Sequence, residues 1–181
     1  KLVSAVAFSP RGDQASFLAL DGQKVDLGVV PLAGGEERLL VRALGLRRFP
    51  EVSLYPPAWS PDGKRIAYTA KATEEDSTKD FEVWIVDVAG GGKSRVSVPG
   101  EPSFGPVWSK DGTGVYFQYD DHGNTKVAFT TLDGKIQSLA GNLGGTSHGR
   151  PYSGGSFSVA GDGRFAYTQT RPEYPADIAA G

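Results

Sequence analysis

Short apolar segments recur along the whole chain, and each is bounded by glycine, proline, aspartate or serine. Between residues 53 and 98 these segments read SLYPPAWS, RIAYTA, EVWIVDV and SRVSV. They are rich in β-branched and aromatic residues, and lengths of about four to eight residues are typical of strands. The stretch ATEEDSTKDF has no apolar residues at helical spacing, so we interpret it as a solvated acidic loop. The pattern predicts an all-β chain.

One phrase of this pattern occurs four times at a nearly constant spacing. FSPRG begins at Phe8, WSPDG at Trp59, WSKDG at Trp108 and VAGDG at Val159, so the copies lie 51, 49 and 51 residues apart. A strand-like segment follows each copy, and the first three copies continue with another strand, a glycine turn and a final short strand. A fixed period of this length is typical of repeat architectures. Four short antiparallel strands per repeat describe one blade of a β-propeller.

The residues of the repeated phrase are those of a tight turn between two strands. In Ser60-Pro61-Asp62-Gly63 of the second copy, Pro61 sets φ near −65°, and the serine and aspartate side chains can bind backbone amides. Gly63 supplies the positive φ that closes a hairpin. The other residues vary between copies, but the glycine is always present, as Gly12, Gly63, Gly112 and Gly163.

We therefore predict an all-β fold, a β-propeller of four-stranded antiparallel blades, of which about three and a half are present. Propellers typically close with about four to eight blades, so we expect this chain to be part of a larger protein and to meet further blades. We expect the apolar residue before each turn, Phe8, Trp59, Trp108 or Val159, to pack between neighbouring sheets. The predicted blades cover about residues 5–42, 55–98 and 104–140, with a half blade at 153–181.

Composition narrows the classes of partner. The 181 residues include 19 basic and 21 acidic side chains, and a net charge of −2 gives no bulk attraction to nucleic acid or an anionic membrane. No apolar run approaches the roughly 20 residues of a membrane-spanning helix. The absence of cysteine excludes disulfides and thiol nucleophiles. Because no metal-ligand spacing, phosphate loop or dinucleotide fingerprint occurs, we expect no cofactor and no metal.

The repeat resembles that of two known groups of proteins. PAWSPDGKRIAYTA followed by EVWIVDVAGG is similar to the propeller repeat of TolB-like periplasmic proteins and of the N-terminal domain of prolyl oligopeptidase family serine peptidases. The last segment, SGGSFSVAGDGRFAYTQTRPEYPADIAAG, resembles the acylaminoacyl-peptidase and dipeptidyl-peptidase branch. TolB-like repeats are also usually shorter. The peptidase is therefore the first interpretation, and a TolB-like scaffold for protein partners is the alternative.

The peptidase resemblance implies an α/β-hydrolase domain with a Ser, Asp and His triad, which these 181 residues do not contain. It implies activity on short or N-acylated peptides, with the propeller covering the active site and restricting entry. The chain would then not be catalytic by itself, and no substrate-binding residue of the family can be matched to a position here. The expected location is cytoplasmic, or periplasmic if the protein is TolB-like.

The segment GTSHG, residues 145–149, fits the G-x-S-x-G pattern of a hydrolase nucleophile, with His148 next to Ser147. That pattern requires the serine to lie on a sharp turn between a buried strand and a helix. Both flanks, AGNLGG and RPYSGGS, are unsuited to either element. A triad base must also come from elsewhere in the fold. We interpret the segment as a flexible connection into the fourth blade, and predict no catalytic residue.

Three other segments could carry chemistry. YDDHGN, residues 119–124, could bind a cation or a substrate ammonium, but its residues are also common turn formers and we favour a turn. TEEDSTKD, residues 73–80, is an acidic insertion in the second repeat that could contact a partner domain. Arg47 and Arg48 could clamp a carboxylate, although a surface role is the simpler interpretation.

The order of the strands predicts which end of the propeller carries recognition. If the repeated turns join strands one and two of each blade, and the glycine turns join strands three and four, both sets lie at one end. Longer connections then share the opposite end. Because recognition usually lies on longer loops of a rigid scaffold, we expect substrate or partner contacts at that end. Its loops would comprise residues 47–55, 73–80, 119–124 and 141–152.

Overall fold

The computed structural model describes residues 2–22, 24–46, 55–71, 81–90, 92–147, 150–153, 155–171 and 174–181. No helix occurs among these residues, as predicted for an all-β chain. Two antiparallel sheets of four strands each come first, and in both of them neighbours in sequence are neighbours in the sheet. They are formed by β1 (Leu2–Phe8), β2 (Gln14–Asp21), β3 (Lys24–Pro31) and β4 (Arg38–Val41), and by β5 (Ala58–Trp59), β6 (Arg65–Lys71), β7 (Phe81–Asp87) and β8 (Lys93–Arg95).

The third sheet repeats this order and extends into the last strands of the chain. Its first four strands are β9 (Ser103–Trp108), β10 (Gly114–Asp121), β11 (Asn124–Thr131) and β12 (Ile136–Leu143). A single pair, Leu143 with Gln169, joins β12 to β16 (Phe165–Arg171). β16 also pairs with β15 (Phe157–Val159) and β17 (Tyr174–Ala180), so these three strands form a separate antiparallel unit.

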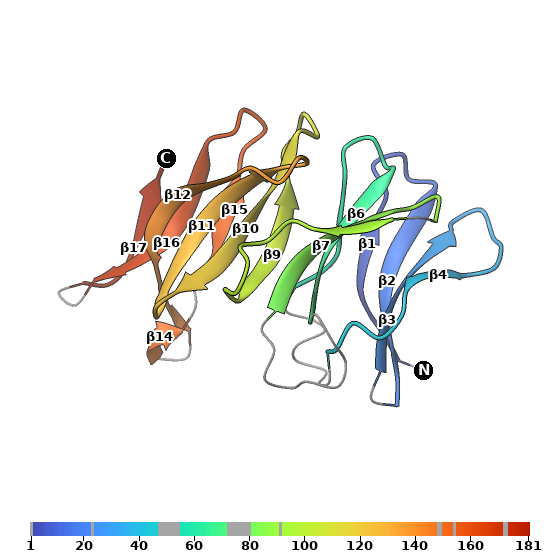
Figure 1. Cartoon of the computed structure of the whole chain (residues 1–181), viewed down its shortest axis with the longest axis horizontal. Coiled ribbons are helices and arrows are strands. Elements are labelled where there is room, and N and C mark those ends of the chain that lie inside the picture. Colours follow the sequence, from blue (N-terminus) through green and yellow to red (C-terminus); the bar gives the residue numbers. More distant parts are fainter. Residues whose placement is uncertain are drawn as a thin grey trace.

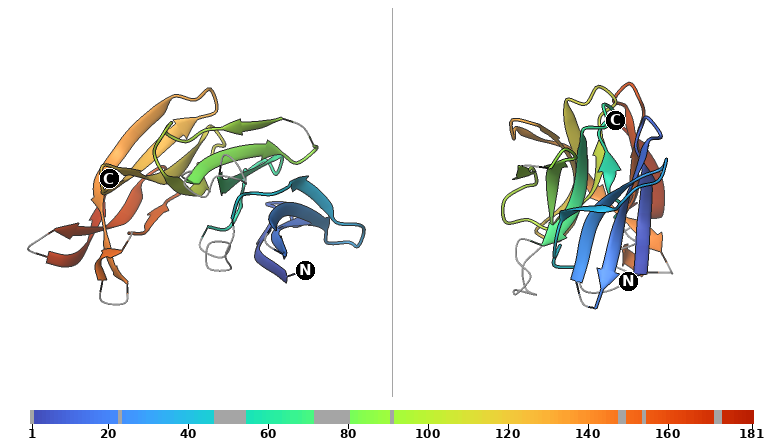
Figure 2. Two further views of the ribbon diagram at one scale, coloured as in Figure 1. Left: turned by 60° about the horizontal axis from the view of Figure 1, so that its bottom comes forward. Right: turned by 90° about the vertical axis from the view of Figure 1, so that its right-hand side faces the viewer.

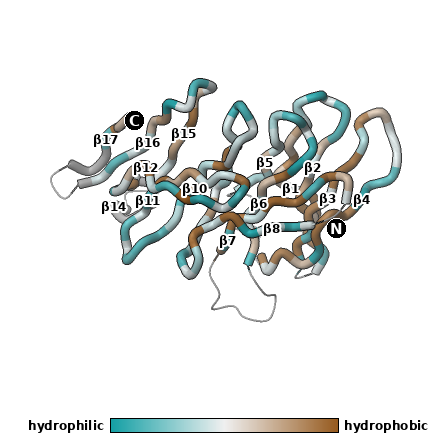
Figure 3. The backbone as a smooth tube through the Cα atoms, turned by 45° about the horizontal axis from the view of Figure 1, so that its top comes forward, coloured by the Kyte–Doolittle hydropathy of each residue, from teal (hydrophilic) through white to brown (hydrophobic). Residues whose placement is uncertain are grey.

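The sheets stand side by side in chain order (Figure 1), and in the turned view they follow an arc (Figure 2, left). Apolar residues fill the spaces between the first and second sheets and between the second and third sheets. One buried cluster joins Leu27 and Val41 of the first sheet to Ile66 and Val86 of the second. Another joins Val83 of the second sheet to the third, where Trp108, Val115 and Phe117 lie. Figure 3 shows the apolar residues along the strands and the polar residues concentrated in the turns.

The predicted turns are confirmed at all four positions. Gly12, Gly63, Gly112 and Gly163 have φ values of 69°, 69°, 72° and 88°, the left-handed region in which glycine alone is unstrained. These turns join the first two strands of each unit and lie at one end of the sheets, at the top of Figure 1. We call this the turn end. The β10–β11 turn and β13–β14 lie at the opposite end, the loop end.

The connection between the third sheet and the last strands differs from the prediction. We expected a flexible segment, but β13 (Gly145–Ser147) pairs with β14 (Arg150–Ser153) in a two-stranded antiparallel hairpin. The sequence did not predict this hairpin, because Gly144 and Gly145 stand where it begins and glycine is uncommon in strands. Gly144 is required by space, because a Cβ there would lie 1.8 Å from the hydroxyl oxygen of Thr170.

The packing of the residue before each turn is confirmed for some copies and not for others. Trp108 is 8% exposed and lies in the cluster between the second and third sheets. Trp59 packs against the cluster between the first two sheets, and Val159 is half-buried. Phe8, however, is 67% exposed, because β1 belongs to the first sheet and no sheet of the described residues covers its outer face.

Candidate functional site

The four turns are built by the side chains that the sequence repeats. In the second copy, the Ser60 hydroxyl donates a hydrogen bond to the Asp62 carboxylate at 2.7 Å and accepts one from the Arg65 backbone amide at 2.9 Å. Asp62 also accepts the Lys64 amide at 3.0 Å. The Ser60 hydrogen bond is the largest cause that holds the pKa of Asp62 below its ordinary value. The serine and aspartate therefore fix the turn by satisfying its backbone amides.

Neighbouring turns contact one another in series along the turn end. The Arg11 guanidinium donates to the backbone oxygen of Asp62 at 3.0 Å. Pro61 lies beside Gly112, and Lys110 lies beside Gly161. Each copy of the turn therefore touches the following copy, through Pro10 and Arg11 in the first, Pro61 in the second and Lys110 in the third.

Tryptophan residues connect the sheets beneath these turns. The Trp59 Nε1 donates to the backbone oxygen of Ala7 and to the hydroxyl of Ser16, both at 3.0 Å. The Trp108 Nε1 donates in the same way to the backbone oxygen of Ala58 at 2.9 Å. Each indole packs against the preceding sheet, where the residue that faces it is small. Trp59 faces Ser16, and Trp108 faces Ala67.

The third interface reverses this combination of large and small residues. Val159 occupies the position of the tryptophans, and Tyr116 occupies the position of Ser16 and Ala67. The fourth turn is also one residue shorter: the Ala160 amide donates to Arg164, four residues on, whereas the corresponding amides at Ser9, Ser60 and Ser109 reach five residues on. The retained Gly163 was predicted from the repeat, but this deletion was not.

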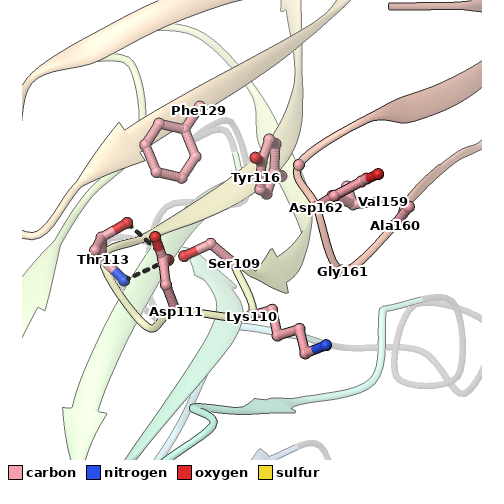
Figure 4. Close-up of a pocket in the computed structure, with 11 residues that line it drawn as sticks. Ser109, Lys110, Asp111, Thr113, Tyr116, Phe129, Val159, Ala160, Gly161 and Asp162 are labelled. Atoms are coloured by element: carbon pink, nitrogen blue, oxygen red, sulfur yellow. Dashed lines mark hydrogen bonds between the residues drawn. The ribbon is translucent and has the colours of Figure 1, made fainter.

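A cavity of about 330 Å³ lies at this altered interface (Figure 4). Tyr116 and Phe129 form an aromatic wall, with ring centroids 4.7 Å apart and planes inclined by 49°. In Figure 4, Tyr116 lies between Phe129 and the turn that carries Asp162. The turns on either side supply the remaining lining, which is Ser109, Lys110, Asp111, Thr113 and residues 159–163.

A second cavity of about 350 Å³ lies at the turn end of the first sheet. Its lining includes Asp13, Glu36 and Arg38. Arg38 is already engaged, because its guanidinium donates to the backbone oxygen of Val88 in the second sheet. The Ser9 hydroxyl donates to Asp13 at 2.6 Å and is the largest cause that lowers the pKa of that carboxyl group. These contacts give both charges a structural role.

At the loop end, residues 119–124 form the predicted turn. His122 and Gly123 have φ values of 50° and 83° and connect the closing pair Asp121 and Asn124. Asp121 accepts from Lys126 and from the His122 ring, both at 2.5 Å. The hydrogen bond between the His122 ring and Asp121 raises the pKa of His122. The hydrogen bond from Lys126 is the largest cause that lowers the pKa of Asp121.

The same turn brings a carboxylate of Glu101 close to Asp121 and His122. One donor atom of each residue lies within 4.8 Å of the others, a spacing that could hold a cation. The Lys126 ammonium, however, already binds the Asp121 carboxylate. The arrangement is accordingly that of an ion-paired hairpin end, which agrees with the turn interpretation of these residues.

The remaining sequence candidates are not assembled into a site. Ser147 ends a short strand of the β13–β14 hairpin, so its backbone lacks the strand–turn–helix context of a hydrolase nucleophile. His148, Arg47, Arg48 and the insertion at residues 73–80 lie outside the described residues. None of the described residues forms a helix long and apolar enough to cross a membrane.

Comparisons with known proteins identify the fold. No protein-family profile matches the chain. An uncharacterized protein of Agrobacterium fabrum is 27% identical over 116 residues, which are 61% of this chain and 35% of that protein. The chain thus spans about a third of the length of this relative.

Two groups of solved propellers superpose on nearly the whole chain. TolB from Acinetobacter baumannii has a TM-score of 0.69 at 17% identity, over 99% of this chain and 40% of TolB. A puromycin-hydrolyzing peptidase from Mycobacterium tuberculosis has a TM-score of 0.66 at 20% identity, over 98% of this chain and 30% of the peptidase. An acylaminoacyl peptidase has a TM-score of 0.63 at 14% identity, over 98% and 30%. The chain has the β-propeller fold that TolB shares with these peptidases.

Proposed function

We propose that this chain is the substrate-selecting propeller of a serine peptidase that acts on short or N-acylated peptides, and that it is not catalytic by itself. The observation that carries the proposal is the match to the puromycin-hydrolyzing peptidase. Almost the entire chain superposes on 30% of that protein, which leaves the larger part of it for other domains. The peptidase-like sequence of residues 153–181 supports the same assignment.

The structure is consistent with a role in selection. Buried apolar clusters and tryptophan hydrogen bonds hold the first three sheets together, which makes this part of the arc a firm scaffold. Such a scaffold can hold its end loops in place over a neighbouring catalytic domain. A hydrolase domain of the same polypeptide would be the partner, and short peptides would be the substrates.

The test uses the complete protein that carries this chain. A fluorophosphonate probe labels activated serines, and N-acetylated and free peptide anilides report hydrolysis. We expect labelling of a serine outside these 181 residues and faster hydrolysis of short peptides than of folded proteins. Deletion of the propeller should then relax the size limit. Absence of both labelling and hydrolysis would contradict the proposal.

The TolB-like scaffold is a second candidate, and a specific observation favours it. Two TolB structures superpose with TM-scores of 0.69 and 0.66, and the chain covers 40% and 53% of their lengths. The chain covers only 30% of the puromycin-hydrolyzing peptidase and of the acylaminoacyl peptidase. In that case the complete protein would consist largely of blades, would lie in the periplasm and would dock protein partners. A folded protein with no serine labelling would favour this candidate.

A further inference from the structure

We infer that the cavity between the third sheet and the β15–β16 hairpin binds an aromatic side chain of an incoming polypeptide. This inference concerns binding alone and goes beyond the proposed function, because it assigns a site at the turn end, opposite to the loops expected to carry recognition. It stands whether the complete protein is a peptidase or a scaffold.

The first argument is the repeat itself. At the two preceding interfaces, the corresponding space is filled from within the chain by the indoles of Trp59 and Trp108, which donate to backbone oxygens of the preceding sheet. At the third interface, the residue at this position is Val159, whose side chain has no ring and no N–H donor. The aromatic rings of this interface instead stand on the preceding sheet, as Tyr116 and Phe129, and the small Val159 leaves a cavity in front of them.

The second argument is the wall that faces this opening. Gly114 allows the Phe129 ring to lie directly on the β10 backbone, because a Cβ at Gly114 would be 2.5 Å from the Phe129 Cζ. Tyr116 then leans against Phe129. Phe129 is only half-buried, so part of its ring remains accessible from the cavity. Two inclined rings offer an edge and a face to a third ring, a geometry that aromatic groups prefer.

The third argument is the size and charge of the cavity. About 330 Å³ is at the lower limit of ligand pockets, which span roughly 300–1,000 Å³, and suits one large side chain better than a whole cofactor. The rim carries one basic residue, Lys110, and two acidic residues, Asp111 and Asp162, and Asp162 is already paired with Arg164 at 2.7 Å, so neither sign of charge dominates. A neutral aromatic group is consequently the best fit among side chains.

The experiment measures binding of 5-fluoro-N-acetyl-tryptophanamide to the complete protein by ¹⁹F NMR line broadening, with N-acetyl-alaninamide as a competitor that lacks the ring. We expect saturable binding that the alanine compound does not displace. Val159→Trp places an indole of the chain itself in the cavity and should weaken binding at least tenfold. Phe129→Ala removes half of the aromatic wall and should also weaken binding at least tenfold.

Leu32→Trp is the matched control, because it adds an indole at an exposed turn residue of the first sheet. Its Kd should stay within twofold of the parent value. Lack of saturable binding to the parent protein, or an unchanged Kd in Val159→Trp, would overturn the inference. Since serine labelling and hydrolysis are measured separately, failure of the proposed peptidase function is distinguishable from failure of this site.

Discussion

The indole Nε1 of Trp59 lies 3.0 Å from the backbone oxygen of Ala7, in the sheet that precedes its own. The Nε1 of Trp108 repeats this relationship with Ala58 at 2.9 Å. The sequence repeat thus specifies more than the strands of each sheet. It also places one indole hydrogen bond at each of two successive interfaces. A directional hydrogen bond fixes the angle between two sheets better than apolar packing alone.

Trp59→Phe should destabilise the protein. The change preserves most of the ring but removes the N–H that Ala7 and Ser16 accept. Loss of a partly buried hydrogen bond of this kind costs about 1–3 kcal/mol. Urea unfolding of the complete protein measures the change.

Trp84→Phe provides the control for that substitution. The buried Trp84 Nε1 has no hydrogen-bond partner in the described structure, so replacing it removes an unsatisfied donor. We expect a change of at most about 0.5 kcal/mol, or slight stabilisation. Equal losses in the two variants would show that ring volume, and not the hydrogen bond, stabilises the interface.

Gly63→Ala should be destabilising because of backbone conformation and not because of crowding. Gly63 has a φ of 69°, and the nearest atom to a Cβ there would be the Arg11 Nε at 3.6 Å. Forcing alanine into the left-handed region costs about 1–2 kcal/mol. Gly92→Ala is the control, since that glycine has open space and no positive φ; thermal unfolding should distinguish the two.

The repeated phrase predicted the hairpins because glycine at a fixed place requires a particular φ whatever surrounds it. The cavity was not predicted, because it results from two changes that only become neighbours in space: Val159 for tryptophan and Tyr116 for a small residue. A comparison of the residues eight positions after each repeat start, namely Ser16, Ala67 and Tyr116, could have found it. The β13–β14 hairpin was missed because its residues have weak strand propensity.

The stability of the protein should decrease in acid. Hydrogen bonds from Ser9, Ser60 and Ser109 are the largest causes that hold the pKa values of Asp13, Asp62 and Asp111 below the ordinary 3.8. As the pH falls, these three aspartates therefore bind protons at a higher pH in the unfolded chain than in the folded protein, which favours unfolding. This contribution is fully present above pH 3.8 and is lost as the pH falls through the lower pKa values of the folded state.

Melting temperatures between pH 7 and pH 2 test this dependence. Ser60→Ala removes the largest cause of the Asp62 shift and should flatten the acid part of the profile. Ser94→Ala, at an exposed position of β8, should leave the profile unchanged. A parent profile that is flat below pH 4 would contradict the assignment.

Ser147→Ala should leave the turnover of the complete protein within a few fold. Ser147 belongs to a strand of a two-stranded hairpin, and the described residues contain no helix to present it as a nucleophile. Loss of a true nucleophile would reduce kcat by several orders of magnitude. A collapse of activity with an unchanged circular dichroism spectrum would reverse this interpretation.

The outer face of the first sheet should make the purified 181-residue chain self-associate. Val3 and Phe8 of β1 pair with Ala19 and Ala15 on the face that points away from the second sheet, and they are 53% and 67% exposed. At about 25 cal/mol per Å² of apolar surface, covering even a few hundred Å² would contribute several kcal/mol. Sedimentation velocity should therefore detect dimers or larger species whose fraction rises with concentration.

The double variant Val3→Ser and Phe8→Ser should move this equilibrium toward monomer, because it removes exposed apolar surface from β1, the edge strand of the sheet. Leu132→Ser and Ile136→Ser, two exposed apolar residues near the β11–β12 turn, form the matched control and should have a smaller effect. If the parent chain sediments as a monomer and unfolds cooperatively, the exposed face of β1 needs no covering sheet, and the expectation of further blades loses its physical basis.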